Sequence, residues 1–212
     1  MLPNHFDLEQ RMAEQRREVE LVLEISYENE EAGGRVLSDE SLQYPIGRFV
    51  KPKSWDPLRT EEAVRSLEAF PSLLRGLVDQ MDDEALGRRY RPGGWTARQV
   101  VHHLADSHMN SFIRMKLALT EERPVIKPYA EDRWALLSDT STLPVAGSLL
   151  LIEQLHARWV VLLRSLSTEQ WQRSFVHPES GEIRLYENAA MYAWHGQHHL
   201  EHIRLAAGAG GK

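Results

Sequence analysis

The chain has 212 residues, no cysteine and a formal net charge of −6 at pH 7. This length predicts one domain that buries a core without disulfide bonds or structural zinc. The absence of cysteine excludes a thiol nucleophile, an iron–sulfur centre and a cysteine-ligated zinc site formed by this sequence.

Charge and hydropathy also limit the expected partners. The basic residues are scattered through an acidic chain, so we expect no nucleic-acid partner. No apolar run approaches the roughly 18 residues that cross a bilayer, and the Met1 end lacks the basic-then-apolar order of a signal peptide. We therefore expect a cytoplasmic protein that does not insert into a membrane.

Residues 1–43 differ in character from the rest of the chain. The stretch "DLEQRMAEQRREVELVLEI" predicts a charged amphipathic helix, and the polar stretch "SYENEEAGGRVLSDES" follows it. This pattern is better suited to covering a surface or a partner subunit than to building a core. We expect an N-terminal extension over 1–43, and we expect a chain that starts near Ser41 to fold and to bind metal.

Helical spacing of apolar residues begins after this extension. It predicts a helix over 59–86, bent at Pro71, before the "RPGGW" stretch breaks the pattern. Thr96 and Gln99 form a capping-box signature that opens a second helix, which runs to about Thr120. "EERPVIKPY" then predicts a loop.

Two further helices complete the expected fold. Pro144 starts a helix through "SLLLIEQLHARWVVLLRSL", and the last helix runs from about Leu185 to Ala207 and ends at Gly208. Turn residues between them predict a small hairpin at 174–184. The chain is therefore expected to be all-α, with a four-helix bundle over 44–207 and a tail over 208–212.

The last helix contains "YAWHGQHHLEHI", in which four of the ten histidines fall within eight residues. Residues four apart share a helical face, so His195/His199 and His198/His202 are the available pairs. Tyr192, Ile203 and Ala206 share a face with His195 and His199, opposite Gln197, Glu201 and Arg204. The apolar side therefore favours His195 and His199 as metal ligands, because neutral imidazoles are common ligands.

A catalytic metal usually needs a third protein ligand and an open position. The stretch "VVHHLADSH" offers His102, His103 and His108, and His156 and His177 are alternatives. His103 shares a helical stripe with Gln99, Ser107, Asn110 and Arg114. That stripe is either a solvent face or the lining of a polar cavity, and the spacing alone does not decide between them.

Several stretches between Tyr44 and Arg204 resemble the DinB-like superfamily, and within it the YfiT group of metal-dependent hydrolases. They are "YPIGRF", "YRPGGWTARQVVHHLADSHMNSFIRMKLALTEE", "LHARWVVLLRSL", "HPESGEI" and "ENAAMYAWHGQHH". The resemblance implies an up-down-down-up bundle, often a homodimer. It also implies a divalent metal held by a histidine eight residues after Trp95 and by an H-x-x-x-H pair. Those positions are His103, His195 and His199.

A His₃ site of this kind suits zinc or nickel, and it can activate either a thiol or water. The resemblance includes thiol-using branches, so we expect a transferase that uses a low-molecular-weight thiol such as bacillithiol. The alternatives are a hydrolase that uses metal-activated water and a metal-binding scaffold without turnover. Asn110 and Arg114 are candidates for binding an anionic group of the substrate. We interpret His108, His156, His198 and His202 as structural or surface residues.

Overall fold

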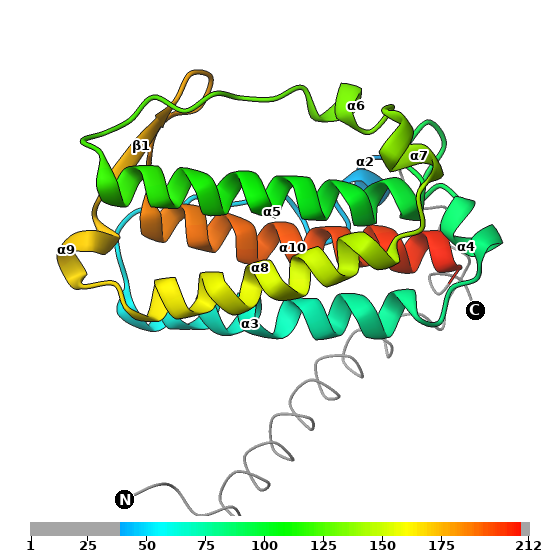
Figure 1. Ribbon diagram of the computed structural model, residues 1–212, viewed down its shortest axis with the longest axis horizontal. Helices are drawn as coiled ribbons and strands as arrows, with labels where there is room; N and C mark the ends of the chain where they lie inside the picture. The colour runs from blue at the N-terminus through cyan, green and yellow to red at the C-terminus, as the bar shows by residue number, and fades with distance from the viewer. Residues whose placement is uncertain (1–38, 209–212) are drawn as a thin grey trace, which may run out of the picture. The chain divides into compact units, whose positions relative to one another are not determined.

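Four long helices form the frame of the described part of the chain, as Figure 1 shows. The computed structural model describes residues 39–208. Within this range the long helices are α3 (Pro57–Val78), α5 (Ala97–Thr120), α8 (Ala146–Arg164) and α10 (Leu185–Ala207). The expected all-α four-helix bundle is confirmed.

Short elements connect the long helices. They are α2 (Asp39–Gln43), α4 (Asp83–Gly87), α6 (Glu131–Trp134), α7 (Ser138–Thr142), α9 (Thr168–Trp171), β1 (Ser174–His177) and β2 (Gly181–Arg184). β1 and β2 pair antiparallel from Ser174↔Arg184 to His177↔Gly181, which confirms the predicted hairpin. Most of the predicted extension lies outside the described residues. Its last five residues form α2, which contacts α10.

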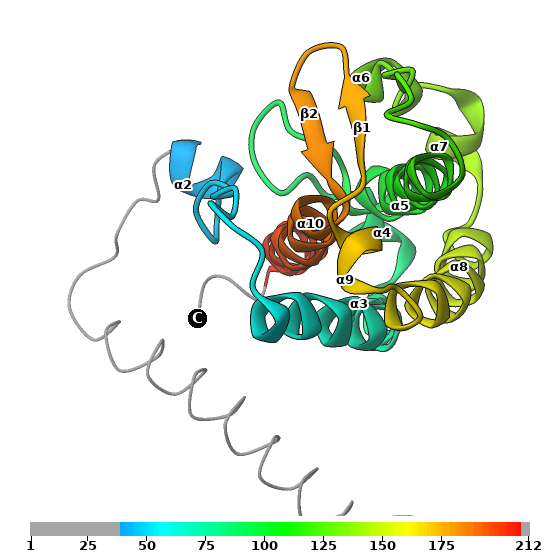
Figure 2. The same cartoon turned by 90° about the vertical axis from the view of Figure 1, so that its left-hand side faces the viewer.

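The chain order gives the bundle an up-down-down-up topology. Figure 1 shows α3 and α10 running in one direction and α5 and α8 in the other. Seen nearly end-on in Figure 2, each long helix occupies one corner. α10 packs against α3 and α5, and α8 packs against the same two helices. α5 and α10 are therefore neighbours, which brings their histidines together.

The first predicted helix is shorter than expected. α3 ends at Val78, and α4 begins separately after Asp82, whose side chain accepts a hydrogen bond from the Ala85 backbone N–H. The predicted range 59–86 therefore contains two helices, because a new N-cap interrupts the apolar pattern. Pro71 does lie inside α3.

The predicted start of α5 is confirmed in detail. The Thr96 hydroxyl accepts from the Gln99 backbone N–H, and the Gln99 side chain accepts in turn from the Thr96 N–H. This reciprocal capping satisfies two N–H groups that the first helical turn leaves without partners. At the same end of the bundle, Gly208 ends α10 with a positive φ of 82°.

The apolar core has two parts. One contains Trp159, Phe112 and Phe175, and the other contains Phe70, Leu104 and Ile203. α8 contributes Trp159 and Ile152 to this core. Among the described residues it is also the one helix whose length and apolar composition would suit a membrane span, and some of its apolar side chains, such as Val161, are exposed. The ring of His108 contacts Phe70 on one side and Tyr192 on the other. Histidines thus lie where the two parts of the core meet.

Candidate metal centre

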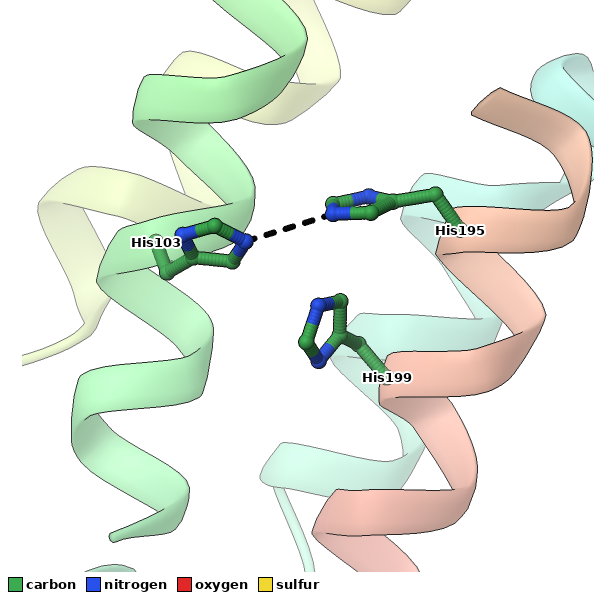
Figure 3. A group of neighbouring side chains, drawn as sticks. All are labelled: His103, His195 and His199. Carbon is green, nitrogen blue, oxygen red and sulfur yellow. Dashed lines mark hydrogen bonds between the residues drawn. The ribbon is translucent and has the colours of Figure 1, made fainter. Parts of the chain in front are cut away.

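Three histidines from two helices point toward one another (Figure 3). His103 comes from α5, and His195 and His199 come from successive turns of α10. The Nε2 atoms of His103 and His195 are 3.2 Å apart, and one ring nitrogen from each of the three lies within 4.8 Å of the others. The predicted ligands are thus brought together.

The geometry of these side chains fits a shared ion. Two imidazole nitrogens that bind a divalent ion at about 2.1 Å lie about 3.0–3.4 Å apart in octahedral or tetrahedral coordination. The separation of 3.2 Å between His103 and His195 falls within this range. The donor set is therefore compatible with zinc or nickel.

Burial keeps the three rings neutral, which is the form that binds a metal. Desolvation, and next the neighbouring His198, lowers the pKa of His103 to about 4. Desolvation also holds the pKa values of His195 and His199 well below their ordinary value, with further lowering by nearby histidines. At neutral pH each ring therefore carries one N–H and one lone pair.

A cavity of about 440 Å³ opens onto the three histidines. Its lining combines aromatic rings, polar groups and charges from five stretches of the chain. The lining residues are Gln43, Tyr44, Tyr90, Arg91, Gly93, Gly94, Trp95, His103, Glu131, Asp132, Trp194, His195, His198, His199 and His202. The volume is sufficient for a small substrate beside an ion.

Other predicted candidates for the third ligand lie elsewhere. The Nε2–H of His102 donates to the Leu143 carbonyl, and its Nδ1 accepts from the Ser148 hydroxyl, so this ring is directed away from the site. His177 lies in the hairpin strand β1. Of the two adjacent histidines in α5, His103 is the one that reaches α10.

His108 and His156 are buried in the bundle, not at its surface. His108 Nε2 lies 3.2 Å from His195 Nδ1, and His108 Nδ1 lies 2.8 Å from His156 Nε2. His156 Nδ1 lies 2.6 Å from the Leu67 carbonyl oxygen. These residues therefore connect a candidate ligand to the backbone of α3.

His198 and His202 are also buried, and with His199 they form a second group whose nitrogens lie within 4.8 Å. His202 Nδ1 is 3.2 Å from His199 Nδ1, and His202 Nε2 is 3.2 Å from the Gln43 carbonyl oxygen. The ring of His202 stacks on Tyr90 at 3.8 Å. Their interpretation as non-ligands stays a prediction.

The two candidate substrate-binding residues are not among the residues that line this cavity. The Asn110 amide donates to the Asp106 carbonyl within α5. Arg114 lines a neighbouring hollow of about 380 Å³, which shares Glu131 and Asp132 with the histidine cavity. Their role in substrate binding stays a prediction.

Several cavity residues were not anticipated from the sequence. Tyr90, Arg91 and Trp95 belong to the "YRPGGW" stretch that was interpreted as a helix break, and Trp194 precedes His195. The aromatic and cationic residues in that glycine-rich stretch were the available signal. Glu131 and Asp132 gave no such signal, because their approach depends on how the long connection between α5 and α8 folds.

Comparison with known proteins indicates the family to which the chain belongs. The model of the DinB superfamily matches residues 66–203. A protein of Oceanobacillus iheyensis, provisionally named a metal-dependent hydrolase, is 53% identical over 161 residues, which cover 76% of this chain and 93% of that protein. YfiT of Bacillus subtilis, which has the same provisional name, is 48% identical over 79% of this chain and 94% of its own length.

The solved structures show the same relationship. The structure of Bacillus subtilis YfiT, an unusual four-helix bundle, matches with a TM-score of 0.77 at 45% identity and covers 80% of this chain and 97% of that one. The mycothiol-dependent maleylpyruvate isomerase matches with a TM-score of 0.56 at 22% identity, over 68% of this chain and 60% of that one, which shows a shared fold. The bundle, the histidine arrangement and these similarities together show that the chain belongs to the DinB superfamily.

Proposed function

We propose that this protein is a metal-dependent enzyme whose divalent ion is held by His103, His195 and His199. The observation that carries the proposal is that three neutral imidazoles from two helices converge at the wall of a 440 Å³ cavity. An ion there would supply Lewis acidity, which lowers the pKa of water or a thiol and so provides a nucleophile at neutral pH. The provisional names of the close relatives support a metal-dependent reaction.

The cavity offers groups that can bind a polar substrate. Among the described residues, His198 Nδ1 and Trp194 Nε1 are buried and have no hydrogen-bond partner, and both residues line the cavity. Arg91 lines it as well and pairs with Asp39 at 3.2 Å, while its Nε has no partner within residues 39–208. The partly exposed guanidinium of Arg91 can bind an anionic or carbonyl group of a substrate.

Glu131 is the cavity residue best suited to accept a proton from the nucleophile. Desolvation, and next the charges of Asp132 and Glu179, raise the pKa of its carboxyl above the ordinary value. A raised pKa brings a carboxylate closer to the range in which a general base is effective at neutral pH. Because it also lines the cavity beside the three histidines, Glu131 is a candidate for the general base.

Hydrolysis is the first reaction to test, because the relatives that are about half identical are provisionally named hydrolases. Transfer of a low-molecular-weight thiol, such as bacillithiol, remains the second candidate. It is consistent with the absence of cysteine from the chain, since the thiol would then come from a cosubstrate. A scaffold without turnover would be expected to close the site with a fourth protein ligand.

The test is an activity assay on zinc-loaded and nickel-loaded protein. Ester and amide substrates are supplied without a thiol, and an electrophile such as a chlorinated aromatic is supplied with bacillithiol. We expect turnover in one of these assays that is lost in the His103→Ala variant and kept in the His102→Ala variant. Turnover that survives His103→Ala would show that the metal is not the catalyst, and absence of turnover in both assays would favour the scaffold.

A further inference from the structure

The first relevant feature is a backbone carbonyl in α3 that lacks its helical donor. In an α-helix each carbonyl accepts from the N–H four residues later, and for Leu67 that residue is Pro71, which has no N–H. His156 Nδ1 lies 2.6 Å from the Leu67 oxygen and takes this place. Because a carbonyl oxygen only accepts, the proton of His156 is on Nδ1 and its Nε2 carries a lone pair.

The position of the proton on His156 determines which nitrogen is protonated in the histidines nearer the candidate metal site. His108 Nδ1 lies 2.8 Å from the lone pair of His156 Nε2, so His108 donates from Nδ1 and keeps a lone pair on Nε2. His195 Nδ1 lies 3.2 Å from that lone pair and donates to it in turn. The remaining nitrogen of His195, Nε2, is thus unprotonated, and it is the atom that lies 3.2 Å from His103.

A second, shorter chain reaches His199. Gln43 is the last residue of α2, where a carbonyl has no partner within its helix. His202 donates from Nε2 to this carbonyl at 3.2 Å, so its Nδ1 carries a lone pair. His199 Nδ1 lies 3.2 Å from His202 Nδ1 and donates to it, which leaves the lone pair of His199 on Nε2.

We infer that the carbonyls of Leu67 and Gln43, acting through buried outer histidines, select the tautomer in which His195 and His199 each present an Nε2 lone pair to the ion. A free neutral imidazole exchanges between two tautomers, and the form with its proton on Nε2 does not bind through that atom. His108, His156 and His202 are therefore positioning residues. This inference rests on the proposed metal site.

The same reasoning explains why His198, His199 and His202 lie close together without forming a second ion site. The 3.2 Å contact between His199 and His202 is a hydrogen bond that serves the site of His103, His195 and His199. It is not the edge of a separate ion site formed with His198. One ion per chain is the consequence, and a second ion lost in the His202→Leu variant would contradict the role assigned to His202.

The first test is the tautomeric state of the histidines in metal-free, full-length protein. Nitrogen-15 NMR of the imidazole rings distinguishes a proton on Nδ1 from a proton on Nε2. We expect His195, His199, His108 and His156 to be protonated on Nδ1 and His202 on Nε2. A proton on Nε2 of His195 would overturn the inference, even if the protein binds metal.

The second test is zinc affinity, measured by competition with a chromophoric chelator. Loss of a partner that orients a ligand typically weakens metal binding about 10–100-fold. We expect this loss in His156→Leu, and we expect His156→Gln to restore most of the affinity. A glutamine amide can donate to Leu67 and accept from His108, so it preserves the chain of hydrogen bonds.

The matched control is His102→Leu, which replaces a buried histidine of α5 whose partners, Ser148 and Leu143, lie outside the chain of hydrogen bonds. It should leave zinc affinity unchanged. Equal affinity in His156→Leu and wild type, or equal loss in His156→Leu and His156→Gln, would overturn the inference. If the wild type binds no divalent ion, the proposed function fails, and the tautomers measured in metal-free protein still decide the inference.

Discussion

Gly196 faces the ring of Phe70 at a distance that leaves no room for a side chain. A Cβ at Gly196 would lie 2.8 Å from Phe70 Cδ2. This close approach joins α10 to α3, and the other ring contacts of Phe70 are with His108 at 5.1 Å and His156 at 5.4 Å. Gly196, which is next to His195, therefore sets how closely α10 packs against α3.

Gly196→Ala should destabilise the protein. Overpacking of a core costs about 1–3 kcal/mol, which exceeds the gain of about 0.8–1.0 kcal/mol from alanine in a helix. The expected net loss is about 1 kcal/mol in urea unfolding. Gly76→Ala is the control, because a Cβ at this α3 position meets nothing within 4 Å, and it should stabilise the protein. Equal effects of the two substitutions would contradict the packing argument.

Much of the fold could be predicted from local patterns. Helical spacing located the four long helices, and the pairing of Thr96 with Gln99 located the start of α5. The apolar side of α10 favours His195 and His199 as ligands, but His198 and His202 are buried as well, so the choice between the two pairs stays a prediction. Apolar spacing does not predict the break after Val78, because that break depends on Asp82 capping a new helix.

The environment of the site could not be predicted in the same way. Periodicity shows which side of a helix is buried, but it does not show which residue of another helix lies opposite. The contact between His108 in α5 and His156 in α8 depends on such a pairing, and so does the Leu67 carbonyl beneath it. Arg114 illustrates the same limit, since its stripe is shared with His103 although it lines a different hollow.

Thr96→Ala should weaken the start of the helix that carries His103. Loss of an N-cap typically costs about 1 kcal/mol, because a backbone N–H loses its acceptor. Thermal and urea unfolding of the variant measure this cost. Thr96→Ser keeps an acceptor for the Gln99 N–H and should behave almost as the wild type. A variant Thr96→Ala as stable as wild type would show that the capping box contributes nothing.

The metal-free protein should lose stability as the solution is acidified. Burial lowers the pKa of His156 to about 4, whereas an unfolded histidine titrates near 6.5. Between these values the unfolded state binds more protons, so each such histidine destabilises the fold by about 1.4 kcal/mol per pH unit. Above pH 6.5 this effect is absent.

Urea unfolding at pH 7, 6 and 5 measures the effect of acid. The slope should be smaller in His156→Gln, which removes one titrating group while retaining hydrogen-bonding capacity. His103 has a pKa lowered to about 4 as well, so the slope should not vanish in that variant. Stability that stays constant from pH 7 to pH 5 would show that these rings are not kept neutral by the fold.

The zinc affinity of a shortened protein should depend on the residue at which it begins. A chain that begins at Asp39 keeps α2, the contact of Asp39 with Arg91 and the Gln43 carbonyl that accepts from His202. It should fold and bind zinc as the full chain does. A chain that begins at Tyr44 lacks that carbonyl and should fold with weaker zinc binding, because His202 loses its acceptor.

Circular dichroism and chelator competition on the two shortened proteins check this prediction. Equal zinc affinity in both would show that α2 does not support the site. Loss of zinc binding in a folded chain that begins at Asp39 would show that residues 1–38 contribute to the site.

The metal content of the purified protein and its variants tests the ligand set directly. Elemental analysis should find one divalent ion per chain in the wild type and almost none in His103→Ala, His195→Ala or His199→Ala. The ion should remain in His102→Ala and His198→Ala, which replace neighbouring histidines that we do not assign as ligands. A wild-type protein without a bound ion, or loss of the ion in His198→Ala with retention in His103→Ala, would contradict the assignment.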